Sequence, residues 1–423
     1  MSLELLPLEI IEELGLDLQD VINIQMLCRS MYVFIKTKTP RIFSLVRFRK
    51  WMKHWSGALM NVKLDNIENL ALFVRTHSLD LFNTQIKDVS QLGLIRNLNL
   101  GCTKVEDVSL LGGVHTLNLS GSLVTDVSAL DKVHTLDISC TKVGDVSALG
   151  KVHTLNLSRT KVIDVSMLGK VHTLDLRDTD IKDVSALGQV HTLDLSYTEV
   201  EDVSSLGKVH ALNLSNTGVK NVSALGKVHT LNLSRTQVID VSMLGKVHTL
   251  DLSYTKVKDV SALGNVHTLN LSRTQVIDVS AFGLVNTLDL SCTPVKNVSA
   301  LGKVHTLDLS YTKVKDVNAL GRVHTLNLSG TPVKNVSALG KVHALDLSDT
   351  PVLDVSSLGQ VHTLDLSDTQ VEDVSALGNV YSLNLSYTNV RDVSALTNVH
   401  TIYCYGIKLQ NIPRSIKVLF EGV

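Results

Sequence analysis

The chain has 423 residues and almost balanced charge, with 40 Lys and Arg residues against 41 Asp and Glu residues. Hydrophobic residues make up 44% of it but aromatic residues only 4%, which predicts a core of Val and Leu rather than of large rings. The near-zero net charge and the sparse aromatics argue against a nucleic-acid partner. No apolar run is long enough to suggest a membrane span.

The N-terminus and the cysteines together indicate an intracellular protein. Residues 1–4 (Met-Ser-Leu-Glu) lack the basic and apolar segments of a secretory signal. Cys102 and Cys140 occupy the same position of a repeat, two units apart, which is about 10 Å at the spacing of stacked strands and too far for a disulfide. We therefore expect free thiols and a cytoplasmic location, with the nucleus as an alternative.

Residues 1–40 are predicted to form a small helical module. Pro7 is placed in a first turn, and apolar residues follow at helical spacing as far as Leu14. A second amphipathic helix is predicted from Asp20 to Arg29. A module of about 35 residues cannot bury a stable core alone, so we expect another surface to cover it.

This module resembles the F-box, which opens with Leu-Pro-x-Glu-Ile and continues with Asp-Leu-x-x-Leu and Val-Cys-Arg stretches. The matching residues are Leu6, Pro7, Glu9 and Ile10, then Asp20, Val21 and Ile24, then Leu27, Cys28 and Arg29. The stretch between Leu14 and Asp20 is a few residues shorter than the family pattern. The resemblance implies docking on a Skp-type adaptor of a cullin-RING ubiquitin ligase through Leu6, Pro7, Glu9, Ile10, Leu14, Ile24 and Cys28. The alternative is a helical cap that shields the following domain.

Residues 41–75 are predicted to be a linker and N-terminal cap, and residues 76–398 repeat a 19-residue unit almost letter for letter. The unit reads V-H-T-L-D/N-L-S-x-T-x-V-x-D-V-S-x-L-G-K, and its positions are numbered 1 to 19 from the first Val, which is Val152 in one copy. A period of this length predicts a solenoid. Alternation over residues 153–158 predicts a short strand, and Asp164 is placed to cap a short helical or 3₁₀ turn.

The repeat resembles the leucine-rich repeat of internalin type, L-x-x-L-x-L-x-x-N, with Thr160 in place of Asn. Because Thr supplies only a hydroxyl, we expect a thinner ladder than the family's Asn ladder. The fold class predicted is an α+β repeat: a right-handed leucine-rich-repeat solenoid with a continuous parallel β-sheet, behind the helical F-box-like module. Residues 399–423 are predicted to be the last degenerate repeat and a C-terminal cap. The near-identity of the copies also resembles repeat proteins of giant DNA viruses.

Three repeat positions are candidates for function. His at position 2 forms a row, but a straight row converges on no metal, so we expect no metal site and no cofactor. Asp or Asn at position 5 is expected to point outward from the strands. Position 8 varies most and carries Arg and Tyr, which are frequent interface anchors. The candidate partner-binding residues are Arg159, Tyr197, Arg235, Tyr254, Arg273, Tyr311 and Tyr387.

No catalytic motif is visible in the sequence. The F-box resemblance and the repeats together predict a non-enzymatic protein that holds an unknown protein substrate for a Skp-cullin-F-box ligase. The alternative is a stand-alone intracellular leucine-rich-repeat binding scaffold with a helical N-terminal cap. Neither hypothesis includes a nucleic acid or a membrane as partner.

Overall fold

The computed structural model describes residues 77–414 and 416–419. These residues belong to two compact units, which divide between Val209 and His210. The predicted F-box-like module of residues 1–40 and the predicted cap of residues 41–75 lie outside the described residues, as do all seven candidate adaptor-binding residues.

Each coil of the solenoid contributes one strand of three residues. The first unit contains β1 (Ser78–Asp80), β2 (Asn97–Asn99), β3 (Thr116–Asn118), β4 (Thr135–Asp137), β5 (Thr154–Asn156), β6 (Thr173–Asp175) and β7 (Thr192–Asp194). The second contains β8 (Ala211–Asn213), β9 (Thr230–Asn232), β10 (Thr249–Asp251), β11 (Thr268–Asn270), β12 (Thr287–Asp289), β13 (Thr306–Asp308), β14 (Thr325–Asn327), β15 (Ala344–Asp346), β16 (Thr363–Asp365), β17 (Ser382–Asn384), β18 (Thr401–Tyr403) and β19 (Lys417–Leu419).

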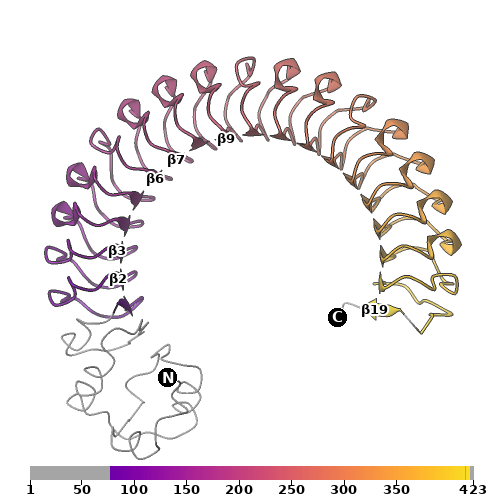
Figure 1. Ribbon diagram of the computed structural model, residues 1–423, viewed down its shortest axis with the longest axis horizontal. Coiled ribbons are helices and arrows are strands. Elements are labelled where there is room, and N and C mark those ends of the chain that lie inside the picture. Colours follow the sequence, from indigo (N-terminus) through magenta and orange to yellow (C-terminus); the bar gives the residue numbers. More distant parts are fainter. Residues whose placement is uncertain (1–76, 415, 420–423) are drawn as a thin grey trace, which may run out of the picture. The chain divides into compact units, whose positions relative to one another are not determined.

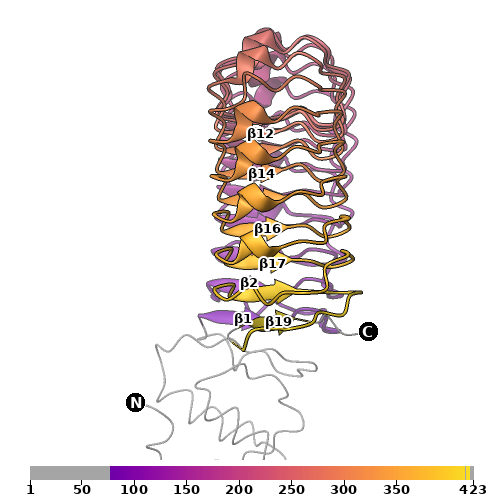
Figure 2. The ribbon, with the colours of Figure 1, turned by 90° about the vertical axis from the view of Figure 1, so that its right-hand side faces the viewer.

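Within each unit the strands pair in parallel with their neighbours in sequence, and Figure 2 shows this stacking for β12, β14, β16 and β17. The register joins identical repeat positions, as where Thr154 pairs with Thr173 and Leu155 with Leu174. The chain segment between the last two paired strands is shorter than one repeat, because Thr401 pairs with Lys417. The C-terminal tail therefore adds one further strand to the second unit.

Most coils return through a 3₁₀ helix on the side opposite the strands, so that each unit has a strand face and an outer face (Figure 1). These helices are η3 (Ser128–Leu130), η4 (Ser147–Leu149), η5 (Ser185–Leu187) and η6 (Ser204–Leu206) in the first unit, and η7 (Ser223–Leu225), η8 (Ser261–Leu263), η9 (Ser280–Phe282), η10 (Asn318–Leu320), η11 (Ser337–Leu339), η12 (Ser356–Leu358) and η13 (Ser375–Leu377) in the second. None of the helices in the described part of the chain has the length and apolar content needed to cross a bilayer.

An acidic side chain precedes this return in most coils. Asp183 Oδ1 accepts a hydrogen bond of 2.9 Å from the N–H of Ser185, the first residue of η5. Asn221 makes the same bond to Ser223 at 3.0 Å in a coil that lacks the acid. The predicted capping role of position 13 is thus performed by a side chain two residues before the helix, which satisfies an N–H group that the short helix leaves without a partner.

The core is a narrow column of Val and Leu. Side chains at positions 1, 4, 6, 11, 14 and 17 are buried in almost every coil, including Val152, Leu155 and Leu157, which are at most 1% exposed. This confirms the apolar positions predicted from the repeat. Each coil contributes only six such residues, so the core grows along the stack and each coil depends on its neighbours for burial.

Glycine at position 18 sets how closely the coils approach. A Cβ atom built on Gly245 would lie 2.3 Å from the carbonyl oxygen of Ala262 in the next coil. The backbone of this glycine region is ordinary: Gly264, at the same position of the next coil, has a φ of −61°. In most coils a side chain at position 18 is thus opposed by space rather than by backbone conformation, although Asp131 and Thr397 occupy this position in two coils.

The Thr at position 9 hydrogen-bonds within its own coil, which agrees with the expectation that Thr forms a thinner ladder between coils than Asn. Thr160 Oγ1 donates to the carbonyl of Leu157 at 2.6 Å, and the same bond recurs along both units, as from Thr255 to Leu252 at 2.6 Å. Where Ser122 replaces Thr, its buried hydroxyl has no hydrogen-bond partner. Thr is shorter than the Asn of the internalin-type pattern. Its hydroxyl forms a local hydrogen bond that closes the turn after each strand.

Candidate binding surface

The turn after each strand holds position 8 in a left-handed backbone conformation. Tyr254, for example, has a φ of +59°, and the N–H of Thr255 closes the turn on the carbonyl of Leu252 at 3.2 Å. Such a turn favours Gly or Asn at its third residue. The sequence carries them in some coils, as at Gly121 and Asn216. In seven other coils, however, the residue is Arg or Tyr.

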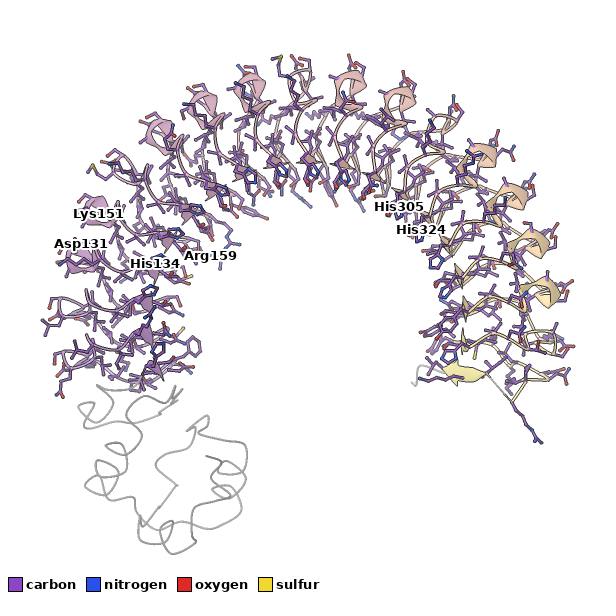
Figure 3. The ribbon with its side chains drawn as sticks, in the orientation of Figure 1. Asp131, His134, Lys151, Arg159, His305 and His324 are labelled. Carbon is purple, nitrogen blue, oxygen red and sulfur yellow. The ribbon has the colours of Figure 1, made fainter. Side chains whose placement is uncertain are left out.

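Those seven residues are the candidate partner-binding residues from the sequence. Arg159 and Tyr197 belong to the first unit, and the other five to the second. The tyrosines are about half exposed or more, from 45% for Tyr254 to 61% for Tyr311. We call the residues at position 8 within each unit the position-8 row. Figure 3 shows Arg159 near the strand face with His134, while Asp131 and Lys151 lie on the outer side of the first unit.

Three members of the position-8 row pack against one another in the second unit. The guanidinium carbon of Arg235 lies 4.2 Å from the ring centroid of Tyr254, and that of Arg273 lies 5.2 Å from the same centroid. Distances of this size are those of cation–π contacts. Each backbone N–H donates to the next coil, as from Arg235 to the carbonyl of Ser253 at 3.0 Å, which fixes the spacing along the row.

In the first unit, charged side chains along the same edge of the strand face form ion pairs with one another. Arg159 Nε donates to Asp178 Oδ2 at 3.1 Å, and Lys161 Nζ lies 3.9 Å from Asp180 Oδ2. Both pairs join neighbouring coils at identical repeat positions and are largely exposed. They contribute little to stability, but they reduce the charge that the edge presents to solvent.

The histidines at position 2 form stacked rows. Successive rings lie 4.6–4.7 Å apart from His115 to His191 in the first unit, and from His210 to His267 in the second. A second row in that unit begins at His305 after Asn286 interrupts the stack. The sequence predicted the row and its pitch but not the ring stacking, which follows from the exact register of the strands.

The stacked rings show no convergence on a metal. His229 Nδ1 lies 3.3 Å from the hydroxyl of Thr230, as in most coils. Among the residues that the structure describes, no three His, Cys, Asp or Glu side chains gather at one point. Desolvation and then the charge of neighbouring imidazoles lower the pKa of His229, so the neutral ring is favoured.

The acidic and amide side chains at position 5 also form hydrogen bonds to the backbone and to neighbouring strands. Asp346 Oδ1 accepts the backbone N–H of Ser348 at 2.9 Å, and this bond recurs in most strands. Asp365 also accepts a bond of 2.9 Å from Asn384 Nδ2 of the following strand. Position 5 therefore stabilises the end of each strand, and its side chains are half-buried.

A shallow hollow of about 430 Å³ lies on the strand face of the second unit. It forms where Ala344 takes the place of the usual Thr at position 3, and Asp346, Asp365 and Tyr403 contribute to its walls. Its lining combines hydroxyl, amide and carboxylate groups with apolar side chains.

No family model matches the chain, and no curated protein matches it. Solved structures share its fold. A leucine-rich-repeat protein of Leptospira interrogans superimposes with a TM-score of 0.58 at 18% identity, over 77% of this chain and 94% of that one. The functional domain of InlJ from Listeria monocytogenes gives 0.51 at 21% identity, over 80% and 76%. The ectodomain of the Arabidopsis thaliana receptor kinase GASSHO1/SCHENGEN3 gives 0.51 at 15% identity, over 86% and 66%.

These likenesses and the register of the strands define the fold class as a leucine-rich-repeat solenoid with parallel strands. The internalin-type resemblance of the repeat agrees with this class. At such low identities the likeness concerns the fold alone, so the function of this chain has to be inferred from its own surface.

Proposed function

We propose that this chain is a non-enzymatic binding protein whose partner surface is the strand face and the position-8 row. One observation carries the proposal: in seven coils a large Arg or Tyr side chain occupies a left-handed backbone position that favours Gly or Asn. Residues held in unfavourable conformations are typical of functional surfaces, and Arg and Tyr are the residue types that most often anchor interfaces. One structure of similar fold, the Arabidopsis receptor ectodomain, was solved in complex with CASPARIAN STRIP INTEGRITY FACTOR 2, which agrees with a binding role.

The more specific proposal is that the chain recruits substrates to a Skp-cullin-F-box ubiquitin ligase. It rests on the F-box resemblance of Leu6, Pro7, Glu9, Ile10, Leu14, Ile24 and Cys28. In this function the N-terminal module binds the adaptor, and the solenoid holds the substrate without chemistry of its own. The alternative is an intracellular scaffold that binds its partner through the same solenoid surface and has a helical cap at its N-terminus.

The adaptor separates the two proposals. The full-length chain is incubated with a purified Skp-type adaptor, beside the double variant Leu6→Ala/Pro7→Ala and the solenoid variant Arg235→Glu/Arg273→Glu. The ligase proposal requires that the wild type and the solenoid variant capture the adaptor and that the N-terminal variant does not. If the wild type captures no adaptor, or if the N-terminal variant captures it equally well, the ligase proposal is wrong and the scaffold proposal stands.

A further inference from the structure

The second unit contains an unneutralised cluster of charge at the edge of its strand face. Arg235, Tyr254 and Arg273 are consecutive in the position-8 row, and all three are exposed. The tyrosine ring lies between the two guanidinium groups, 4.2 Å and 5.2 Å from their central carbons. Contact with the ring restricts both arginines before any ligand arrives, which lowers the entropy lost on binding.

Within the described part of the chain, neither guanidinium group has a carboxylate in ion-pair range. Both coils that carry the arginines have an amide, Asn232 or Asn270, at position 5 of the strand. The nearest acids at position 5 are Asp251 and Asp289, which each accept the N–H of the serine two residues later at 2.8 Å and form no ion pair with either arginine. Lys256, two residues from Tyr254, adds a third positive charge to the edge.

The first unit shows which group satisfies an arginine at this edge. There Arg159 has the same repeat position and left-handed backbone, and it binds the carboxylate of Asp178 at 3.1 Å. At the equivalent positions around Arg235 and Arg273 the chain supplies Tyr254 and Cys292 instead. The cluster therefore has the donors of an ion pair but not the acceptors.

We propose that the cluster of Arg235, Tyr254 and Arg273 binds an acidic peptide segment of a partner protein. This inference rests on the proposed binding function and specifies the chemistry of its ligand. Two coils separate the arginines, a distance of about 10 Å at the pitch of stacked strands. In a polyproline II segment, carboxylates three residues apart lie on one side at about 9 Å. An acidic-x-x-acidic segment in this conformation can place one carboxylate on each guanidinium group, which is suited to two parallel hydrogen bonds.

A peptide fits the cluster better than a single-stranded nucleic acid does. Sequence-tolerant binding of nucleic acids uses open aromatic faces on which bases stack. The guanidinium groups of Arg235 and Arg273 lie over the ring of Tyr254, 4.2 Å and 5.2 Å from its centroid, where they compete with a stacking base. The chain as a whole carries no excess of positive charge to attract a phosphate backbone.

The test is a fluorescence anisotropy titration of the full-length chain against a labelled peptide, Glu-Pro-Pro-Glu-Pro-Pro-Glu. The matched control peptide carries Gln in place of Glu, and a labelled single-stranded RNA is titrated in parallel. We expect saturable binding of the acidic peptide that weakens as salt is added. The double variant Arg235→Gln/Arg273→Gln should lower the affinity by about tenfold or more. Arg235→Lys/Arg273→Lys should give an intermediate loss, since it keeps the charge but not the paired donors.

The charge control is Lys227→Gln/Lys246→Gln, which removes the same charge from position 19 of neighbouring coils and should leave the affinity unchanged. Circular dichroism of each variant establishes that the fold is retained. Equal affinity for the acidic and Gln peptides, equal binding by the Arg→Gln variant, or tighter binding of RNA would each overturn the proposal. Those results would not contradict the wider binding function. That function is tested separately by capture of a protein partner, which should be lost when Tyr311 and Tyr387 are changed and both arginines are kept.

Discussion

At position 8 each coil has a left-handed backbone conformation, which is unfavourable for any residue with a Cβ atom. The left-handed region costs a residue with a Cβ atom about 1–2 kcal/mol, and the described coils adopt it with Cys, Arg, Tyr, Asn and Asp as well as Gly. The turn is imposed from outside the residue, by the hydrogen bond that closes it and by the bond of its N–H to the next coil. A side chain at this position is therefore held in a conformation that its own backbone preference opposes.

Cys140 allows this cost to be measured without disturbing an ion pair or a ring contact. It has a φ of +58° and an exposed side chain. Because Val is β-branched and Gly has no Cβ atom, we expect Cys140→Val to unfold at a free energy about 1–2 kcal/mol below Cys140→Gly in urea titrations. The same two changes at Lys142, whose φ is not positive, serve as the control and should not favour Gly. An advantage of Gly at both sites would show that the turn at position 8 is not the cause.

The titrating side chains predict how stability depends on pH. The serine two residues after Asp240, Asp259 and Asp278 holds the pKa of each carboxyl below its usual range. Its N–H is the larger cause at Asp240 and Asp278, and its hydroxyl is the larger cause at Asp259. Such a carboxyl group stabilises the fold above its unfolded pKa of about 4, and this contribution is lost as the pH falls through the lower folded pKa. Desolvation lowers the pKa of His229 and His324, so stability should also decline as the pH falls below about 6.5, where the unfolded imidazoles gain protons first.

We therefore expect thermal melting temperatures to fall in two stages on acidification, one below about pH 6.5 and one below about pH 4. The triple variant Asp240→Asn/Asp259→Asn/Asp278→Asn should weaken the lower stage and keep the upper one. Asn is a suitable replacement because Asn221 already makes the same hydrogen bond in its own coil. An unchanged lower stage would mean that these carboxylates do not govern acid unfolding.

At the scale of the coil, two constraints act together. The core supplies the driving force through six buried apolar positions, while Gly at position 18 permits the close approach that lets neighbouring cores touch. The approach is not equally tight everywhere: a Cβ on Gly283 would lie 3.3 Å from the carbonyl oxygen of Ala300, against 2.3 Å for Gly245 and Ala262. The coil at Gly283 also carries the large Phe282 in place of Leu.

This difference predicts a graded response to the same substitution. Gly245→Ala should lower the free energy of unfolding by about 1–3 kcal/mol, because the coils must separate to admit the new methyl group. Gly283→Ala should cost less than about 1 kcal/mol, because a shift of a few tenths of an ångström relieves its contact. Urea denaturation of the two single variants measures both values. Equal losses would show that helical preference or chain entropy, and not space, determines the effect.

For the molecule as a whole, stability is a sum of contacts between neighbouring coils. Every strand in the 19-residue array meets its own copy, so no coil depends on a distant one within its unit. The near-identity of the copies makes coils interchangeable in the core, and only the variable positions give each coil an identity. The position-8 row is one of the places where that identity reaches the surface.

Removal of one complete period should therefore leave the fold intact. Deleting residues 323–341 joins Arg322 to Val342 and brings β15 beside β13, with every repeat position still opposite its copy. We expect the melting temperature to change by a few degrees at most, and the binding of the acidic peptide to persist. Deleting only residues 323–331 places apolar positions out of register and should lower the melting temperature markedly. Circular dichroism measures both melting temperatures. Equal changes in melting temperature for the two deletions would contradict the nearest-neighbour account.

The sequence by itself determined the period, the strand of each coil, the apolar core positions and the row of variable residues. It could do so because one pattern is copied many times, so a weak preference in a single coil becomes unambiguous in the array. The F-box resemblance is a sequence prediction of another kind, since it rests on one short degenerate motif in residues 1–40 and stays a prediction.

Only the tertiary structure decided what the neighbours of each side chain are. The left-handed backbone of Tyr254, the local bond of Thr160 and the stacking of His115 on His134 depend on how one coil meets the next. The sequence also left Arg159 and Arg235 equivalent, although one has a carboxylate partner and the other a tyrosine ring. Their difference arises because contacts across the stack join residues 19 apart, and a single coil contains no information about which charge lies beside it.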